Sequence, residues 1–163
     1  MDKHAVNNWG MAIHREMKLN VTRSEFYDPT LSTPAARIRN TRLSRNMTIK
    51  ELAELSGLTC EAISNIETNK HTPKMPTFRA LAKSLKVPIS YLGCFEILPE
   101  QTLGQKIKKA RLFHGYNREE FAKRVGVNVR TLRLWEQDKV KPTGGNKDTL
   151  NRYMNILKSS PKT

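Results

Sequence analysis

The sequence predicts an all-α protein in which one small helical unit occurs twice. Residues 58–70 and 127–139 carry matching aliphatic, polar and acidic positions, and the two stretches lie 69 residues apart. Each copy also has apolar residues at helical intervals, a capping signature and a glycine corner between two helices. The same shift superposes further identical residues: Ile38 on Ile107, Arg42 on Arg111, Leu43 on Leu112, Glu51 on Glu120, Ala53 on Ala122, Gly57 on Gly126, Glu67 on Glu136 and Pro73 on Pro142. We therefore expect a tandem of two related helical domains.

The repeat sets the expected domain boundaries within the 163 residues. We expect an N-terminal extension over residues 1–34, a first head over 35–97, a short linker over 98–103, a second head over 104–158 and a tail over 159–163. Each head is close to the lower size limit for a self-sufficient hydrophobic core. Two small domains are therefore expected in place of one larger domain.

The extension begins with a predicted amphipathic helix over residues 5–19. Its apolar residues at helical intervals are Val6, Trp9, Ile13 and Met17. Residues 20–34 are rich in Thr, Ser and Pro, which predicts a loop or tether. We expect the helix to pack on the neighbouring head. The alternative is that residues 1–34 form a homodimer contact or bind a protein partner.

The outer helices of each head follow from apolar spacing. The first head is expected to open with a helix over residues 35–44, with Ile38 and Leu43 facing the core. Further helices are expected over residues 77–85, 89–95 and 147–157.

The central helices of each head are marked by their capping residues. Thr48 and Glu51 have the spacing of a capping box, in which hydroxyl and carboxylate each satisfy a backbone donor, so a second helix begins there. Gly57 suits the left-handed corner that ends this helix, and Thr59 is expected to cap the third helix. The corresponding residues of the second head are Asn117, Glu120, Gly126 and Asn128. In the middle of the second helix, Ala53 and Ala122 are small enough for the third helix to cross closely.

The charge balance predicts a polyanionic partner. The chain has 29 Lys and Arg against 15 Asp and Glu, a net charge of +14. The excess lies on the repeats, because residues 35–97 carry 10 basic and 5 acidic side chains and residues 98–163 carry 15 and 6. Such a field gains affinity by releasing counterions from phosphates, which predicts binding to nucleic acid.

Other classes of protein are disfavoured by what the sequence contains. No apolar run approaches the roughly 20 residues needed to span a bilayer, and the start of the chain has no secretory apolar core. We therefore expect a cytoplasmic, nucleoid-associated protein without a membrane partner. The two cysteines, Cys60 and Cys94, form no paired metal or redox motif, and no phosphate loop or nucleophile motif is present. We expect no enzymatic activity, no cofactor and no metal.

A longer pattern runs through both heads. In the first head it is Leu52-Ala53-x3-Gly57-Leu58-x4-Ile63-Ser64-x-Ile66-Glu67-x2-Lys70-x2-Pro73, and in the second it is Phe121-Ala122-x3-Gly126-Val127-x4-Leu132-x2-Trp135-Glu136-x5-Pro142. This pattern resembles the lambda-repressor/Cro (Xre) family of helix-turn-helix domains, and the second copy is closest to antitoxin-type regulators of that family. The resemblance implies four or five helices per head, with the third entering the major groove. It also implies Arg–Glu pairs between the first and third helices, here Arg42 with Glu67 and Arg111 with Glu136, which we interpret as scaffold and not as DNA contacts.

Helical geometry selects the base-reading face of each third helix. At about 100° per residue, the polar residues of the first copy fall on one arc and its aliphatic residues on the opposite arc. The residues expected to face bases are Cys60, Glu61, Ser64 and Asn65 in the first head and Val129, Arg130, Arg133 and Leu134 in the second. Arginine forks suit guanine, and Asn65 suits adenine. Trp135 is expected in the core. Because a carboxylate at Glu61 is repelled by phosphates, the second head is expected to be the stronger reader.

Phosphate contacts are expected from helix N-termini and nearby basic groups, which fix the register on the duplex. The candidates are Thr48, Thr59, Lys70, His71 and Lys74 in the first head and Arg118, Asn128, Lys139, Lys141 and Thr143 in the second.

Together these features predict a sequence-specific regulator that binds double-stranded DNA, most simply a transcriptional repressor of a bacterium, phage or mobile element. Two heads on one chain suit adjacent half-sites about one helical turn apart. One alternative is an antitoxin-like autoregulator that also binds a protein partner. The other is an accessory factor of a mobile element that bends DNA.

Overall fold

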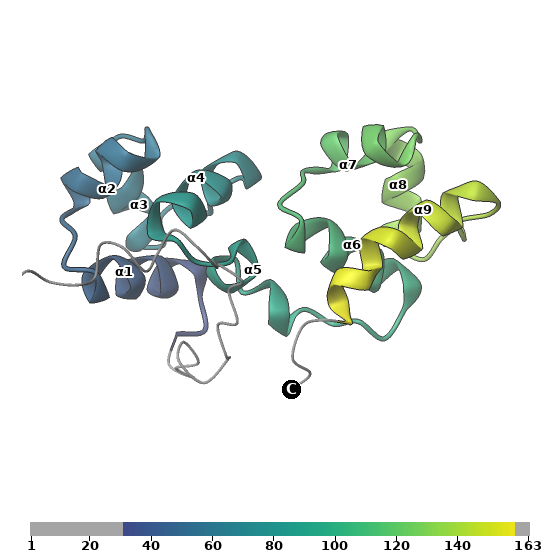
Figure 1. The fold of residues 1–163 in the computed structure, drawn as a ribbon, viewed down its shortest axis with the longest axis horizontal. Helices are drawn as coiled ribbons and strands as arrows, with labels where there is room; N and C mark the ends of the chain where they lie inside the picture. Colours follow the sequence, from purple (N-terminus) through teal and green to yellow (C-terminus); the bar gives the residue numbers. More distant parts are fainter. Residues whose placement is uncertain (1–30, 159–163) are drawn as a thin grey trace, which may run out of the picture.

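The computed structural model describes residues 31–158, and every described helix belongs to one of two all-helical bodies joined side by side (Figure 1). The elements, in chain order, are α1 (Pro34–Ser44), α2 (Ile49–Ser56), α3 (Cys60–Glu67), α4 (Met75–Leu85), α5 (Ile89–Leu92), the short 3-10 helix η2 (Phe95–Ile97), α6 (Leu103–Phe113), α7 (Arg118–Val125), α8 (Val129–Glu136), α9 (Gly145–Met154) and the 3-10 helix η3 (Asn155–Leu157). The predicted helix over residues 5–19 and the tail over 159–163 lie outside the described residues. The all-α prediction is confirmed.

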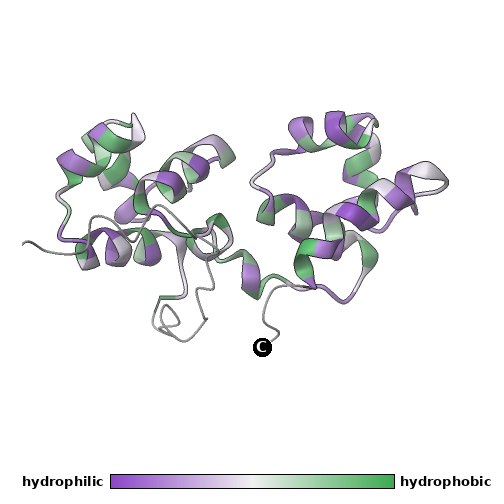
Figure 2. Cartoon of the chain, viewed as in Figure 1, coloured by the Kyte–Doolittle hydropathy of each residue, from purple (hydrophilic) through white to green (hydrophobic). Residues whose placement is uncertain are grey.

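The first head is built around aliphatic side chains that α1 to α5 turn inward. Ile38, Leu52, Ile63 and Leu81 are completely buried in this cluster. Helix α2 packs against α3 and α4, while α1 lies against α3, α4 and α5. Figure 2 shows hydrophobic and hydrophilic residues alternating along these helices, as expected for helices that bury one face.

The second head repeats this arrangement with a more aromatic core. Ile107, Phe121, Leu132 and Leu150 are fully buried or nearly so. Helix α8 packs on both α6 and α7, and α9 closes the bundle against α6 and α7. Trp135 is 4% exposed and belongs to this core, as the sequence predicted.

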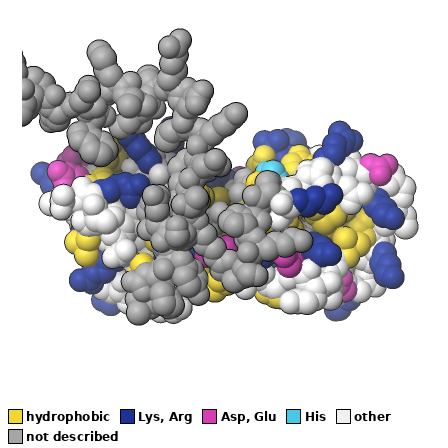
Figure 3. Space-filling view, turned by 60° about the horizontal axis from the view of Figure 1, so that its bottom comes forward, with side chains coloured by type: hydrophobic (Ala, Val, Ile, Leu, Met, Phe, Trp, Pro, Cys, Tyr) yellow, Lys and Arg dark blue, Asp and Glu magenta, His cyan; other side chains and the backbone are white. Residues whose placement is uncertain are grey.

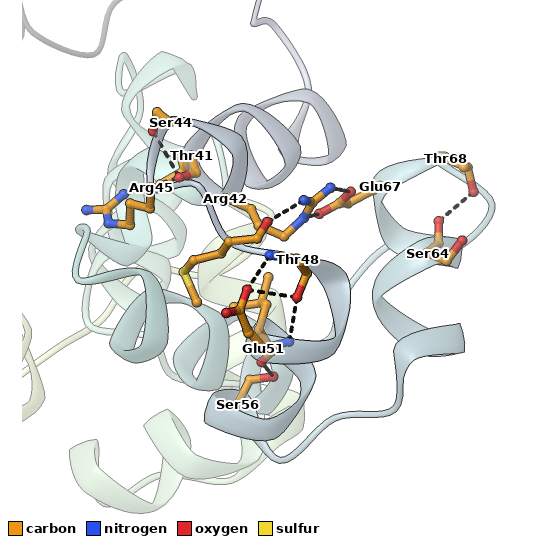
Figure 4. Close-up of polar contacts among 12 residues, drawn as sticks. Thr41, Arg42, Ser44, Arg45, Thr48, Glu51, Ser56, Ser64, Glu67 and Thr68 are labelled. Carbon is orange, nitrogen blue, oxygen red and sulfur yellow. Dashed lines mark hydrogen bonds and ion pairs between the residues drawn. The ribbon is translucent and has the colours of Figure 1, made fainter.

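The predicted capping boxes are present in both heads. In the first, the Thr48 hydroxyl accepts a hydrogen bond from the Glu51 backbone N–H at 3.1 Å, and the Glu51 carboxylate accepts one from the Thr48 N–H at 2.7 Å (Figure 4). In the second, Asn117 and Glu120 make the equivalent pair of bonds. Helices α2 and α7 both end at a glycine in the left-handed region, Gly57 with φ 69° and Gly126 with φ 79°. At these two points the chain can therefore turn sharply into the third helix of the head.

The predicted Arg–Glu pairs are present in both heads, and they are buried. Arg42 donates two hydrogen bonds to Glu67, both at 2.7 Å, and Arg111 donates two to Glu136, at 2.6 and 3.4 Å (Figure 4 shows the first pair). All four side chains are buried. The bond from Glu67 raises the pKa of Arg42 above its ordinary value, so the guanidinium stays charged. In each head the same arginine also donates to a carbonyl of the following loop.

Several details differ from the sequence expectations. Leu43 is 51% exposed and does not face the core, because five residues along a helix turn it about 140° away from Ile38. Its repeat counterpart Leu112 packs instead against the core of the first head. Helix α4 begins at Met75, since Pro76 fits the first turn of a helix. The helix expected over residues 89–95 is interrupted at Cys94, which has φ 54°.

The remaining boundaries shift by a few residues. Helix α6 begins at Leu103, inside the stretch expected as linker, because Thr102 caps it and Gln105 completes a capping box. The helix expected over 147–157 begins at Gly145 and tightens into η3 after Met154.

Enlarging Ala122 is expected to lower thermal stability. This residue is 1% exposed in α7, where α8 packs. Ala122→Leu inserts atoms into a filled core and should cost about 1–3 kcal/mol in the free energy of unfolding. Lys123→Leu, at the exposed neighbouring position, is the control. Thermal melts followed by circular dichroism measure both variants, and equal melting temperatures for the two would contradict the close-crossing argument.

Candidate nucleic-acid interface

Helix α8 is placed by its cap and by the glycine corner before it. After Gly126, the Asn128 side chain accepts a hydrogen bond from the Arg130 backbone N–H at 2.8 Å, which fixes the first turn of the helix. The inward stripe of α8 carries Leu132 and Trp135, both buried. The opposite side must therefore face away from the second core.

That outer side carries two arginines. Arg130 and Arg133 are exposed, while Val129 and Leu134 are half-buried beside them. Val129 packs partly against the second core, so only part of its side chain is open to a ligand. Within residues 31–158, neither guanidinium has a carboxylate or carbonyl partner. Both forks are therefore free to bind an external acceptor.

Helix α3 presents a different surface at the equivalent positions. Cys60 and Glu61 are exposed, and Ser64 and Asn65 are half-buried. The backbone carbonyls of Ser64 and Asn65 are occupied by the turn that follows, accepting from Thr68 and from the Lys70 N–H. Both side chains lie on the outer side of α3. The face is neutral to acidic, unlike that of α8.

All ten predicted phosphate contacts are exposed, but four of them already have internal partners. The Thr48 hydroxyl accepts from the Glu51 N–H and donates its one hydrogen to the Glu51 carboxylate, so that hydrogen is not available to a phosphate while the capping box is intact. Thr59 and Asn128 accept cap bonds through their oxygens and retain donor hydrogens. The exposed candidates without side-chain partners in the described part of the chain are Lys70, His71, Lys74, Lys139, Lys141 and Thr143. Figure 3 shows Lys and Arg side chains on the surfaces of both heads.

Arg118 has a second role that the sequence did not reveal. Its Nε donates to Glu136 Oε2 at 2.7 Å, so Glu136 is shared by buried Arg111 and by Arg118, whose side chain is 43% exposed. The repeat counterpart of Arg118 is Ile49, which packs on the first core. This difference between the copies was visible in the sequence, although the shared carboxylate was not.

The turn after α8 is also fixed by a residue outside the predictions. Asp138 accepts hydrogen bonds from the Thr102 hydroxyl, at 2.5 Å, and from the Gly104 N–H, at 2.7 Å. The bond from Thr102 contributes most to holding the pKa of Asp138 below its ordinary value. A β-carbon at Gly104 would come within 2.4 Å of the Trp135 carbonyl oxygen, so glycine is required where α6 meets α8. The turn therefore places Lys139 and Lys141 directly beyond α8.

Comparison with known proteins agrees with this geometry. The helix-turn-helix family pattern of the lambda-repressor type matches residues 38–92 and again residues 107–156. The chain belongs to this family. Both matched segments are therefore helix-turn-helix domains, and each contains two helices joined at a glycine corner, α2–α3 and α7–α8.

One known protein is similar in sequence to part of this helix-turn-helix protein. It is a protein of Bacillus subtilis (strain 168) named as an uncharacterized HTH-type transcriptional regulator, RghRB. The two are 39% identical over 69 residues, which cover 39% of this chain and 50% of the relative. The similarity thus reaches about half the length of that protein. Within residues 31–158 of the present chain, no helix is both long and apolar enough to cross a bilayer.

Arg111 and Arg118 are expected to differ sharply in their effect on stability, although both bind Glu136. Arg111→Met leaves a buried carboxylate with one exposed partner and should cost about 3–5 kcal/mol in the free energy of unfolding. Arg118→Met removes a half-exposed partner and should cost about 1 kcal/mol or less. Urea unfolding measures both. Similar losses for the two variants would show that burial does not set the strength of these pairs.

Proposed function

We propose that the protein is a sequence-specific regulator of transcription that binds double-stranded DNA, with α8 as its principal base-reading helix. The observation that carries the proposal is the pair Arg130 and Arg133, both exposed and both without an internal acceptor on the outer side of α8. An arginine fork can donate to O6 and N7 of guanine at once, so two forks on neighbouring turns suit two base pairs.

The surroundings of α8 support binding to the sugar-phosphate backbone. Lys139 and Lys141 follow the helix, and Asn128 retains amide donors at its start. Contacts at both ends of a recognition helix fix its depth and register in the major groove. Residues 98–163 have 15 basic against 6 acidic side chains, which adds attraction that does not depend on sequence.

The first head is proposed as the weaker reader. Glu61 stands where the second head has Arg130, and Ser64 stands where it has Arg133. Glu61 can accept from the cytosine amino group and Asn65 suits adenine, but a carboxylate near phosphates reduces affinity. We propose a repressor that acts in the cytoplasm at the nucleoid, where a bound chain would block access of polymerase to the occupied duplex.

The decisive experiment is selection of bound duplexes from a random pool by the full chain, followed by footprinting. A defined motif with protection centred on guanines is expected. Binding that shows no preference for any duplex over a heparin-like competitor would overturn the proposal, because the charge of the protein alone would then account for its affinity.

Removing either arginine fork should relax base selectivity. Arg130→Ala or Arg133→Ala is expected to cost about 1–3 kcal/mol on the selected site, with loss of preference at one base pair each. Lys106→Ala removes the same charge from an exposed position on α6 and serves as the control. Competition binding against single-base variants gives the measurement. Unchanged site choice in both arginine variants would remove α8 from the reading role.

Lys139 should contribute to affinity without affecting base choice. Its backbone N–H bonds to the Leu134 carbonyl at 2.9 Å, so the turn holds the residue at the end of α8. Lys139→Ala is expected to weaken binding to all duplexes equally and to reduce the slope of log affinity against log salt by about one. Titrations at several salt concentrations test this. A slope equal to that of the parent protein would exclude a phosphate contact.

A further inference from the structure

A bidentate ion pair connects the two heads. Arg79, on α4 of the first head, donates to both carboxylate oxygens of Glu120 on α7, at 2.8 and 2.9 Å. The same guanidinium donates to the Gly115 carbonyl at 2.6 Å. Glu120 raises the pKa of Arg79, and the bond from Arg79 is the main cause of the lowered pKa of Glu120. Three bonds from one planar fork fix both distance and rotation between the helices.

A buried lysine makes the second connection. Lys109, on α6, has a side chain that is 9% exposed, and its Nζ donates to the carbonyls of Glu96 and Leu98, both at 2.9 Å. Glu100 lies 3.2 Å from the same ammonium. A buried ammonium is costly unless its hydrogens are bonded, so α6 is held where these acceptors are. The acceptors belong to the C-terminal end of the first head and to the linker that follows it.

Apolar contacts fill the space between these polar ones. Leu112 and Phe113 at the end of α6 pack against the first core. A β-carbon at Gly115, which has φ 70°, would come within 3.0 Å of Ile89 Cδ1. The heads are thus docked through ion pairing, buried hydrogen bonds and close packing together, and α5 lies against α6. Figure 1 shows the chain running on from α5 into the second head.

The ion pair reaches the proposed DNA-binding surface. Glu120 also caps α7 through the Asn117 N–H, next to Arg118. Its repeat counterpart Glu51 makes the same cap but has no partner in the other head. Docking of the heads is therefore a function that only the second copy of this glutamate performs.

We propose that Arg79, Lys109 and Glu120 form an interdomain clamp that makes the two heads one rigid reader of a composite duplex site. The clamp restricts tight binding to two half-sites with one spacing and one relative orientation. The inference rests on the proposed function. On B-DNA an insertion of about five base pairs moves a half-site to the opposite face of the duplex, where a rigid pair of heads cannot reach both halves.

The test measures how the affinity of the full chain for DNA depends on the number of base pairs between the two half-sites, which we call its spacing profile. The clamp variant is Arg79→Ala with Lys109→Met, and its control is Lys83→Ala with Lys106→Ala, which removes the same charges from exposed positions on the same two helices. In the parent and control, inserting about five base pairs between the selected half-sites should weaken binding about 100-fold. In the clamp variant this penalty should fall by at least about tenfold, because freed heads can adapt. Arg79→Ala alone, at a side chain 40% exposed, is the milder variant if the double one does not fold.

An unchanged spacing profile in the clamp variants would overturn the inference, as would a parent footprint that covers only one half-site.

A measurement without DNA separates this failure from failure of the proposed function. Spin labels on exposed Cys60 and on Gln137→Cys, at the exposed end of α8, report the distance between α3 and α8 in both backgrounds, while Cys94 is buried. A narrow distance distribution in the parent that broadens in the clamp variant supports the clamp. A broad distribution in the parent refutes it, whether or not DNA binds. A narrow distribution without duplex preference refutes the proposed function and leaves rigid docking standing.

Discussion

The arrangement of each head depends on one buried ion pair between its first and third helices. Burial of its apolar stripe decides which side of a short helix faces the core, but that burial is not directional, so it does not by itself fix the exact rotation and register of the helix. The forked contact between Arg42 and Glu67 does so for α3, and that between Arg111 and Glu136 does so for α8. Each arginine also holds a loop carbonyl, Met47 or Tyr116, which ties the intervening corner to the same point.

With the rotation fixed, the outer side of the third helix can vary without disturbing the core. The two copies share their capping boxes, left-handed glycine corners and buried pairs, yet their outer faces diverge. Arg130 replaces Glu61 and Arg133 replaces Ser64 at equivalent points of α8 and α3. The same scaffold therefore presents a strongly basic face in one head and a neutral to acidic face in the other.

The copies also diverge where they meet. Leu43 is exposed in α1, whereas its counterpart Leu112 in α6 is half-buried against the core of the first head. Glu51 only caps its helix, whereas Glu120 caps α7 and also binds Arg79. The same surface of the repeated unit is therefore exposed in the first head and in contact with the other head in the second. Because these contacts combine packing with directional polar bonds, they set the placement of α3 relative to α8.

Much of the fold could be predicted from the sequence because its signals are local. Capping boxes, glycine corners, apolar spacing and the 69-residue repeat specify the helices, and the family resemblance supplied the Arg–Glu pairs. The outward placement of Arg130 and Arg133 followed from helical periodicity alone. Local signals failed where a residue's environment comes from another part of the chain.

Three cases decided by tertiary structure show this limit. Leu43 and Leu112 occupy equivalent positions, and only the neighbouring head determines which of them is covered. Arg118 could be assigned to phosphate from its charge, but its bond to Glu136 depends on how α7 lies against α8. Lys109 looks like one more surface charge in a basic helix, yet it is buried and bonded to carbonyls at the end of the preceding head and in the linker. The sequence by itself determined the helices and their outer faces, because these depend on neighbours a few residues away. Only the tertiary structure decided how the heads dock, because that depends on distant groups meeting in space.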